Sequence, residues 1–152
     1  MLSQFLRFRV INNSGQTVTF NNNGRLNLKV TGWIIDPTTG NITYTQLSDD
    51  DLAFIAGDSF VDGGEETSSE IDNTSTLYIG FQVQLEITHD EGTLADGAFD
   101  IYLDEGDATS ELQSDASGYN NAKANGLEFV GFLIWESNGL DDEIMRSNVF
   151  NI

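Results

Sequence analysis

The sequence predicts an all-β fold, a two-sheet antiparallel β-sandwich of jelly-roll or Greek-key type. The first observation is that apolar and polar residues alternate with a period of two through most of the chain. The second is that turn-forming pairs such as Asn23-Gly24 and Asp96-Gly97 separate the alternating runs. The third is that no stretch has the 3.6-residue period of a long amphipathic helix. Eight or nine strands with two long loops fit two packed sheets.

The clearest strand is 75–88, in which every second residue is apolar: Leu77, Ile79, Phe81, Val83, Leu85 and Ile87. One apolar face and one mostly polar face describe a half-buried strand. The same pattern, taken along the chain, predicts strands at 4–11, 16–20, 25–35, 41–46, 52–56, 75–88, 97–104, 127–136 and 143–151. Residues 57–74 and 105–125 are rich in Gly, Asp, Glu and Ser and are interpreted as long loops, with a short helical turn near Ser110 to Gln113 as an open alternative.

The chain is predicted to be a single domain covering residues 1–152, because it has an ordinary domain length and no internal repeat or linker. It contains no cysteine, so no disulfide is possible. The N-terminal residues lack the continuous apolar region of a signal peptide, and no apolar run is long enough to span a membrane. We therefore expect synthesis in a cytoplasm without a signal peptide.

Charge is divided unevenly along the chain. The first 35 residues contain no acid and four cations, whereas all 25 acidic residues follow, and the net charge is −19. The four cations Arg7, Arg9, Arg25 and Lys29 fall on the polar faces of two predicted strands. They are expected to bind an acidic surface on another copy of the chain or on a partner protein. The excess of acid argues against binding nucleic acid or an anionic membrane.

The strand 127–136 is apolar on both faces, unlike the others. Phe129, Leu133 and Trp135 are assigned to one face, and Val130, Phe132 and Ile134 to the other. A strand of this kind is covered on both sides. Either the loop 105–125 covers the second face, or Val130, Phe132 and Ile134 form a subunit contact; we favour the contact, because aromatic side chains are favoured anchors there.

No catalytic constellation emerges from the sequence. His89 is the only histidine and is interpreted as a surface turn residue, and no nucleophile-elbow or phosphate-binding motif occurs. Trp33 and Trp135 would stack on sugars only if exposed, and their apolar strands favour the core. We expect no enzymatic activity and no cofactor.

Acidic runs raise the question of calcium, which prefers clustered carboxylates. None of the runs has the EF-hand spacing, so solvated loops are favoured and no metal site is assigned. The runs considered are Asp49-Asp50-Asp51, Asp62 with Glu65 and Glu66, Asp104-Glu105-Gly106-Asp107, and Asp141-Asp142-Glu143.

The second half of the chain resembles small β-sandwich structural proteins of tailed bacteriophages. The resemblance covers residues 75–152 and rests on three segments: 77–81 (Leu-Tyr-Ile-Gly-Phe), 97–104 (Gly-Ala-Phe-Asp-Ile-Tyr-Leu-Asp) and 130–134 (Val-Gly-Phe-Leu-Ile). It implies a virion protein that decorates a capsid or belongs to a tail or fibre, without catalytic residues. The loop at Glu105-Gly106-Asp107 departs from the Ser/Thr-Asp-Gly-Gly loop common in that class.

The leading hypothesis is therefore a non-enzymatic virion protein, a capsid decoration (cement) protein that self-assembles, with a trimer favoured, and binds the major capsid protein or other virion proteins. The alternatives are a carbohydrate-binding, lectin-like module on a tail or fibre and, third, a hydrolase acting on glycans through paired carboxylates.

Overall fold

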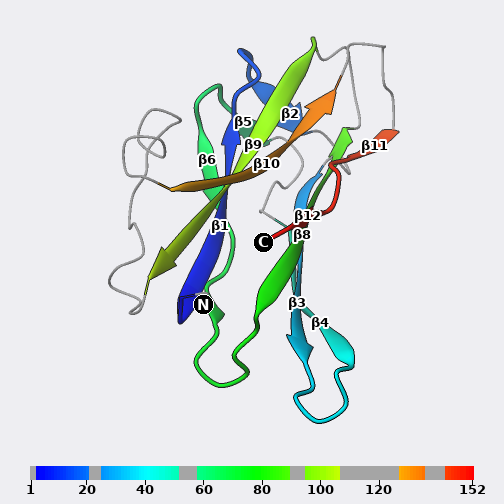
Figure 1. Ribbon diagram of the computed structural model, residues 1–152. Helices are drawn as coiled ribbons and strands as arrows, with labels where there is room; N and C mark the ends of the chain where they lie inside the picture. The colour runs from blue at the N-terminus through cyan, green and yellow to red at the C-terminus, as the bar shows by residue number, and fades with distance from the viewer. Residues whose placement is uncertain (1–2, 21–24, 52–57, 90–94, 107–126, 136–142) are drawn as a thin grey trace.

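The computed structural model describes residues 3–20, 25–51, 58–89, 95–106, 127–135 and 143–152. These residues form twelve strands and no helix, and every strand pair is antiparallel (Figure 1). The prediction of an all-β sandwich is confirmed. Within this part of the chain there is no helix long and apolar enough to cross a membrane.

The first sheet has the strand order β10-β9-β1-β6, with β7 pairing beside β6 on the same edge of β1. Its strands are β1 (Phe5–Asn12), β6 (Glu65–Thr67), β7 (Ile71–Asp72), β9 (Gly97–Gly106) and β10 (Glu128–Trp135). The central pair β1 and β9 comes from opposite halves of the sequence, and eight consecutive residues of β1 are paired, from Phe5 with Gly106 to Asn12 with Phe99.

The second sheet has the order β11-β8-β3-β4, with β12 also pairing with β8. Its strands are β3 (Arg25–Ile35), β4 (Ile42–Asp51), β8 (Gly80–His89), β11 (Glu143–Arg146) and β12 (Phe150–Asn151). The predicted strand 143–151 is thus two short strands. The Ser147 hydroxyl, which accepts a hydrogen bond from the Leu85 amide at 2.9 Å, lies where the two are separated.

The core lies between the two sheets and includes the short pair β2 (Val18–Phe20) and β5 (Asp58–Phe60). Alternate residues of the central strands supply it, as the period-two pattern predicts: Leu6, Phe8 and Val10 from β1, Leu26, Leu28 and Val30 from β3, Phe81, Val83, Leu85 and Ile87 from β8, and Phe99, Ile101 and Leu103 from β9. The outward-facing residues of the same strands are therefore the ones available for function.

Three boundary predictions were wrong. The strand predicted at 41–46 continues to Asp51 as β4. Residues 57–74 are not a plain loop, because β5, β6 and β7 lie within them. The strand predicted at 75–88 begins only at Gly80, and Leu77 and Ile79 are exposed rather than on the core face with Phe81. Leu77 has a positive φ of 54°, which breaks the alternation, and the buried Asn73 side chain accepts a hydrogen bond from the Tyr78 amide at 2.6 Å.

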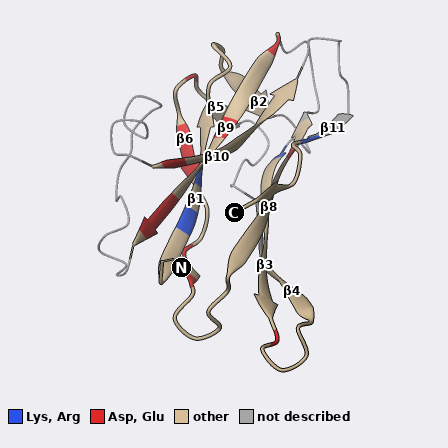
Figure 2. Ribbon diagram, viewed as in Figure 1, with Lys and Arg blue, Asp and Glu red and all other residues tan. Residues whose placement is uncertain are grey.

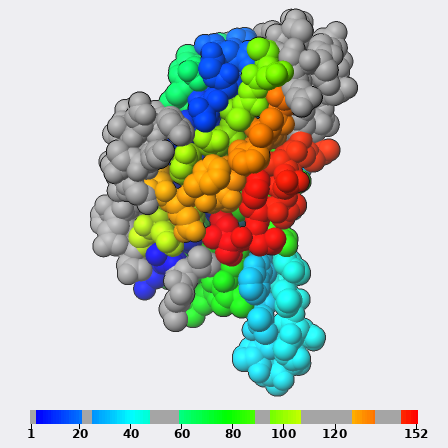
Figure 3. Space-filling model, turned by 45° about the horizontal axis from the view of Figure 1, so that its top comes forward, coloured from blue at the N-terminus to red at the C-terminus, as the bar shows by residue number. Residues whose placement is uncertain are grey.

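Other predictions lie outside the described residues: the strand 52–56, the helical turn near Ser110 to Gln113, and most of the loop 105–125. The β3–β4 hairpin extends beyond the rest of the sandwich as an arm, seen in cyan in Figure 3. Its tip is the turn from Asp36 to Asn41, closed by Gly40 with a φ of 73°. This arm continues the outer face of the second sheet.

Candidate interaction surface

Arg9 lies at the centre of a buried charge network on the outer face of the first sheet. It is only 1% exposed, although it occupies a polar-face position of β1. Its Nε and Nη2 atoms donate to the Asp104 carboxylate of β9 at 3.1 and 2.8 Å, and its Nη1 donates to Glu65 of β6. The acids that neutralise this cation therefore come from the two strands flanking β1, coloured red beside the blue of β1 in Figure 2.

Arg7 belongs to the same network. Its Nε donates to the same Asp104 oxygen at 2.9 Å, and its side chain is 19% exposed against 2% for Asp104. In the register Arg7 is directly opposite Asp104, so the ladder itself brings the pair together. One carboxylate oxygen thus accepts hydrogen bonds from two guanidinium groups, and such charge-assisted bonds are the strong ones.

The cations of the second sheet have a different environment. Lys29 lies 3.3 Å from Glu86 of β8, which also accepts a hydrogen bond from Arg146 at 2.6 Å. The Lys29 and Arg146 side chains are 39% and 51% exposed. Arg25 is exposed at the start of β3.

The expectation that these four cations face an acidic partner therefore needs correction. Arg9 is too buried to reach a partner, and Arg7 and Lys29 already have carboxylates within the chain. The absence of acids in the first 35 residues is misleading, because in a sheet the neighbouring charges come from strands distant in the sequence. Arg25 is exposed, and its contact with an acidic partner stays a prediction.

The strand β10 carries an exposed apolar strip, which we define as Phe129, Phe132 and Ile134. These side chains are 50%, 45% and 60% exposed. Phe132 and Ile134 were predicted on the outer face, but Val130 was wrongly placed with them. A register shift between Phe129 and Gly131 turns Phe129 outward and lets Val130 pack against the core. Such a bulge adds one residue to a strand and reverses the alternation beyond it.

The apolar strip is continuous with a small cluster on the same sheet face. The Phe129 ring lies 6.4 Å from Phe132 at an interplanar angle of 30°, and 5.5 Å from Tyr102 in an edge contact. Tyr102 is buried with Ile11, and Leu127 packs on both. Tyr102 is also the ladder partner of Arg9, so the strip borders the charge network.

Asp100 lies beside the strip, opposite Phe132 in the ladder. Burial raises the pKa of its carboxyl group, and a hydrogen bond at 3.0 Å from the Asn13 side chain opposes that shift. Removing water from a charged carboxylate costs more free energy than removing it from the neighbouring aromatic rings. It marks the polar border of the strip.

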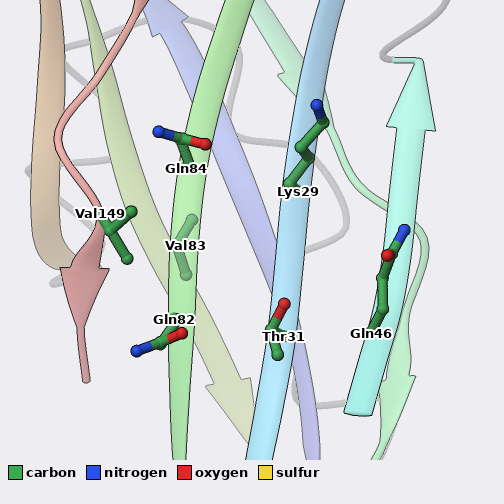
Figure 4. Close-up of a pocket in the computed structure, with 7 residues that line it drawn as sticks. All are labelled: Lys29, Thr31, Gln46, Gln82, Val83, Gln84 and Val149. Atoms are coloured by element: carbon green, nitrogen blue, oxygen red, sulfur yellow. The ribbon is translucent and has the colours of Figure 1, made fainter. Parts of the chain in front are cut away.

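A shallow groove lies on the outer face of the second sheet (Figure 4). Its side chains come from adjacent strands, with Lys29 and Thr31 on β3, Gln46 on β4, Gln82 and Gln84 on β8, and Val149 just before β12. This groove was not predicted from the sequence, because glutamine and threonine on a polar strand face carry no specific signal.

The remaining candidates divide between the core, the surface and the undescribed part of the chain. Trp135 is buried as predicted, with its indole donating to the Ala95 carbonyl at 2.8 Å. Trp33, also predicted in the core, is only half-buried and lies on the outer face of β3. Among the described side chains, no three acids or histidines gather into a metal site. The side chains of His89, Asp49-Asp50-Asp51 and Asp141-Asp142-Glu143 lie outside that description.

Comparison with known proteins does not assign the chain to a family. No family model matches it, and neither the curated proteins nor the solved structures include a significant match.

Proposed function

We propose that the protein is a non-enzymatic structural component of a tailed-phage virion, a decoration protein that self-assembles through the apolar strip of β10 and binds the shell. The observation that carries the self-assembly is the strip itself, and the virion role rests on the resemblance of residues 75–152. Three large apolar side chains on one edge strand are each about half exposed, and two of them are stacked aromatic rings. Exposed apolar side chains gathered in this way are typical of protein contacts.

The occupant best suited to the strip is a second copy of the chain. Copies that each carry a net charge of −19 repel one another, so they associate best through surfaces free of acid. The three residues of the strip are uncharged, and Phe132 and Ile134 alternate along the strand with Leu133 and Trp135, which are fixed in the core. A rigid strand that presents two rings at low entropic cost is a suitable interface anchor. We expect a closed homo-oligomer, and we propose a trimer as its state.

Analytical ultracentrifugation of the wild type and of Phe132→Asp tests this assembly. The wild type should sediment as an oligomer, and Phe132→Asp should sediment as a monomer because it places a charge in a dry interface. Val61→Asp is the matched control, since Val61 is 55% exposed and lies in the turn after β5, away from the strip. A monomeric wild type, or an oligomer that persists in Phe132→Asp, would contradict the assembly.

Binding to a shell needs a separate measurement. The purified protein should cosediment with phage particles assembled without it, and it should saturate at a fixed number of copies per particle. Phe132→Asp should bind less tightly per chain, because it loses the avidity of the oligomer. Absence of saturable binding by an oligomeric wild type would restrict the proposal to self-assembly.

A further inference from the structure

The groove of the second sheet is formed at two successive levels of the strand ladder. Thr31 is paired with Gln46 on one side and Gln82 on the other, and Lys29 is paired with Gln84. Residues two apart on a strand share a face, so these side chains rise from one surface. The result is a concentration of amide, hydroxyl and ammonium groups on a sheet of an otherwise strongly acidic chain.

Two of the glutamines are held in place by the C-terminal segment. The Gln82 amide nitrogen donates to the Asn151 side chain at 3.2 Å, and the Gln84 amide nitrogen donates to the Ser147 carbonyl at 3.2 Å. Figure 4 shows the consequence: both amide nitrogens point away from β3, and both carbonyl oxygens point towards it, across the groove. The groove therefore presents hydrogen-bond acceptors in fixed positions.

An aromatic platform continues the groove along the arm. Trp33 is paired with Tyr44 at the next ladder level, and Tyr44 is 54% exposed. On its other side Trp33 is paired with Gly80, where an added Cβ atom would lie 2.4 Å from three atoms of the indole. The indole thus lies across the Gly80 backbone, and only glycine leaves room for that position.

The combination of aromatic rings and fixed amides suits a particular chemistry. A sugar ring offers apolar C–H faces, which pack on aromatic rings, and hydroxyl groups at its edge, which both donate and accept hydrogen bonds. The lining contains a single charge, Lys29, which is already paired with Glu86. The net charge of −19 repels polyanions, so a neutral ligand is favoured over an anionic one.

We propose that this face of β3, β4 and β8 binds a neutral oligosaccharide. Trp33 and Tyr44 stack against one sugar ring, while Gln46, Gln82 and Gln84 hydrogen-bond the hydroxyl groups of the following rings. The distance from the Trp33–Tyr44 level to the Lys29–Gln84 level is two steps of two residues, about 13 Å, enough for about three sugar units. This activity goes beyond assembly and uses the sheet opposite the apolar strip.

Titration with defined sugars tests the proposal. The probes are glucose and the hexasaccharides of β-1,4-linked glucose, α-1,4-linked glucose and β-1,4-linked mannose, measured by calorimetry and by tryptophan emission. At least one hexasaccharide should bind with a Kd between about 10 μM and 1 mM, and glucose should bind at least about tenfold more weakly. Trp135 is buried, so a change in emission reports on Trp33.

Variants locate the site. Tyr44→Ala and Gln82→Ala should each weaken the hexasaccharide by about tenfold or more, whereas Phe132→Ala, on the other sheet, should leave the affinity unchanged. Circular dichroism checks that each variant is folded. The proposal is overturned if no hexasaccharide binds at about 5 mM, or if Tyr44→Ala binds as the wild type does. The sedimentation result for Phe132→Asp is independent of either outcome.

Discussion

A cationic side chain on the outer face of the first sheet has a different environment from one on the outer face of the second. On the first sheet, Arg9 is buried and its charge is neutralised by carboxylates from both neighbouring strands. On the second, Lys29 occupies an equivalent polar-face position but remains partly in water beside Glu86. The first face also carries an apolar strip. The second has a polar groove, with Trp33 and Tyr44 opposite each other in the strand register beyond it.

The contrast shows that a polar residue on a strand face has no fixed role. A central strand with acids on both neighbours forms a buried network, in which each charge depends on the others. On the second sheet, Lys29 has a described ion pair with one acid, Glu86 of β8, and its side chain stays partly in water, where an ion pair contributes little. Stability should therefore depend on the face of the first sheet, and ligand binding on the face of the second.

The largest expected difference in stability is between two variants, each of which removes one cation from the outer face of one sheet. Arg9→Met leaves Asp104 and Glu65 buried without their shared partner, and should lower the free energy of unfolding by about 3–5 kcal/mol. Lys29→Met is the matched variant and should cost about 0–1 kcal/mol, because the Lys29–Glu86 pair is partly exposed. Urea denaturation of both proteins measures the difference. Equal losses would mean that the two faces do not differ as described.

An intermediate effect is expected from adding one methyl group to each sheet. In Gly131→Ala the new Cβ would lie 2.4 Å from the Phe150 ring, which packs against the core, and the strain should cost about 1–3 kcal/mol. In Gly80→Ala the conflict is with the Trp33 indole, and Trp33 is only half-buried on the outer face of the sheet.

Gly80→Ala should therefore be less destabilising than Gly131→Ala, but should shift the tryptophan emission and weaken hexasaccharide binding. Thermal unfolding and fluorescence of the two variants give both quantities. A larger loss of stability in Gly80→Ala would indicate that Trp33 is part of the packed core instead of a movable platform.

The smallest effect concerns pH. Burial raises the pKa of Asp100, so the folded protein binds this proton more tightly than the unfolded chain does. Its contribution to stability therefore grows as the pH falls through the folded pKa and decreases as the pH rises. Asp100→Asn should raise the free energy of unfolding at pH 7 by up to about 1 kcal/mol, with a smaller gain at pH 4.

The pKa of Asp72 is shifted in the opposite direction, so Asp72 serves as the control for the pH dependence of stability. Hydrogen bonds from the Thr74 hydroxyl and amide lower the pKa of Asp72. Its contribution is present above the unfolded value of 3.8 and is lost as the pH falls through the folded pKa. Asp72→Asn should therefore reduce stability at pH 7 and have less effect in acid. Urea denaturation at pH 4 and pH 7 distinguishes the two carboxyls, and the same sign for both would contradict these assignments.

The fold class and the strands with regular alternation were predictable from the amino-acid pattern. The strand from Arg25 to Ile35 has the predicted bounds, and Phe81, Val83, Leu85 and Ile87 face the core as expected. Gly15, Gly40 and Gly63 lie in turns at positive φ, a conformation that glycine adopts readily. These features are local, because a period of two and a glycine in a turn each depend on only a few neighbouring residues.

The contacts between side chains of different strands were not predictable from the amino-acid pattern. The bulge before Gly131 exchanges Phe129 and Val130 between faces, because one inserted residue reverses the alternation on one side of the bulge. Arg7 and Arg9 pair with acids that are more than fifty residues away in the sequence. Gln82 and Asn151, which form a hydrogen bond, are also more than fifty residues apart in the sequence. Such contacts depend on strand order and register, which short-range patterns do not encode.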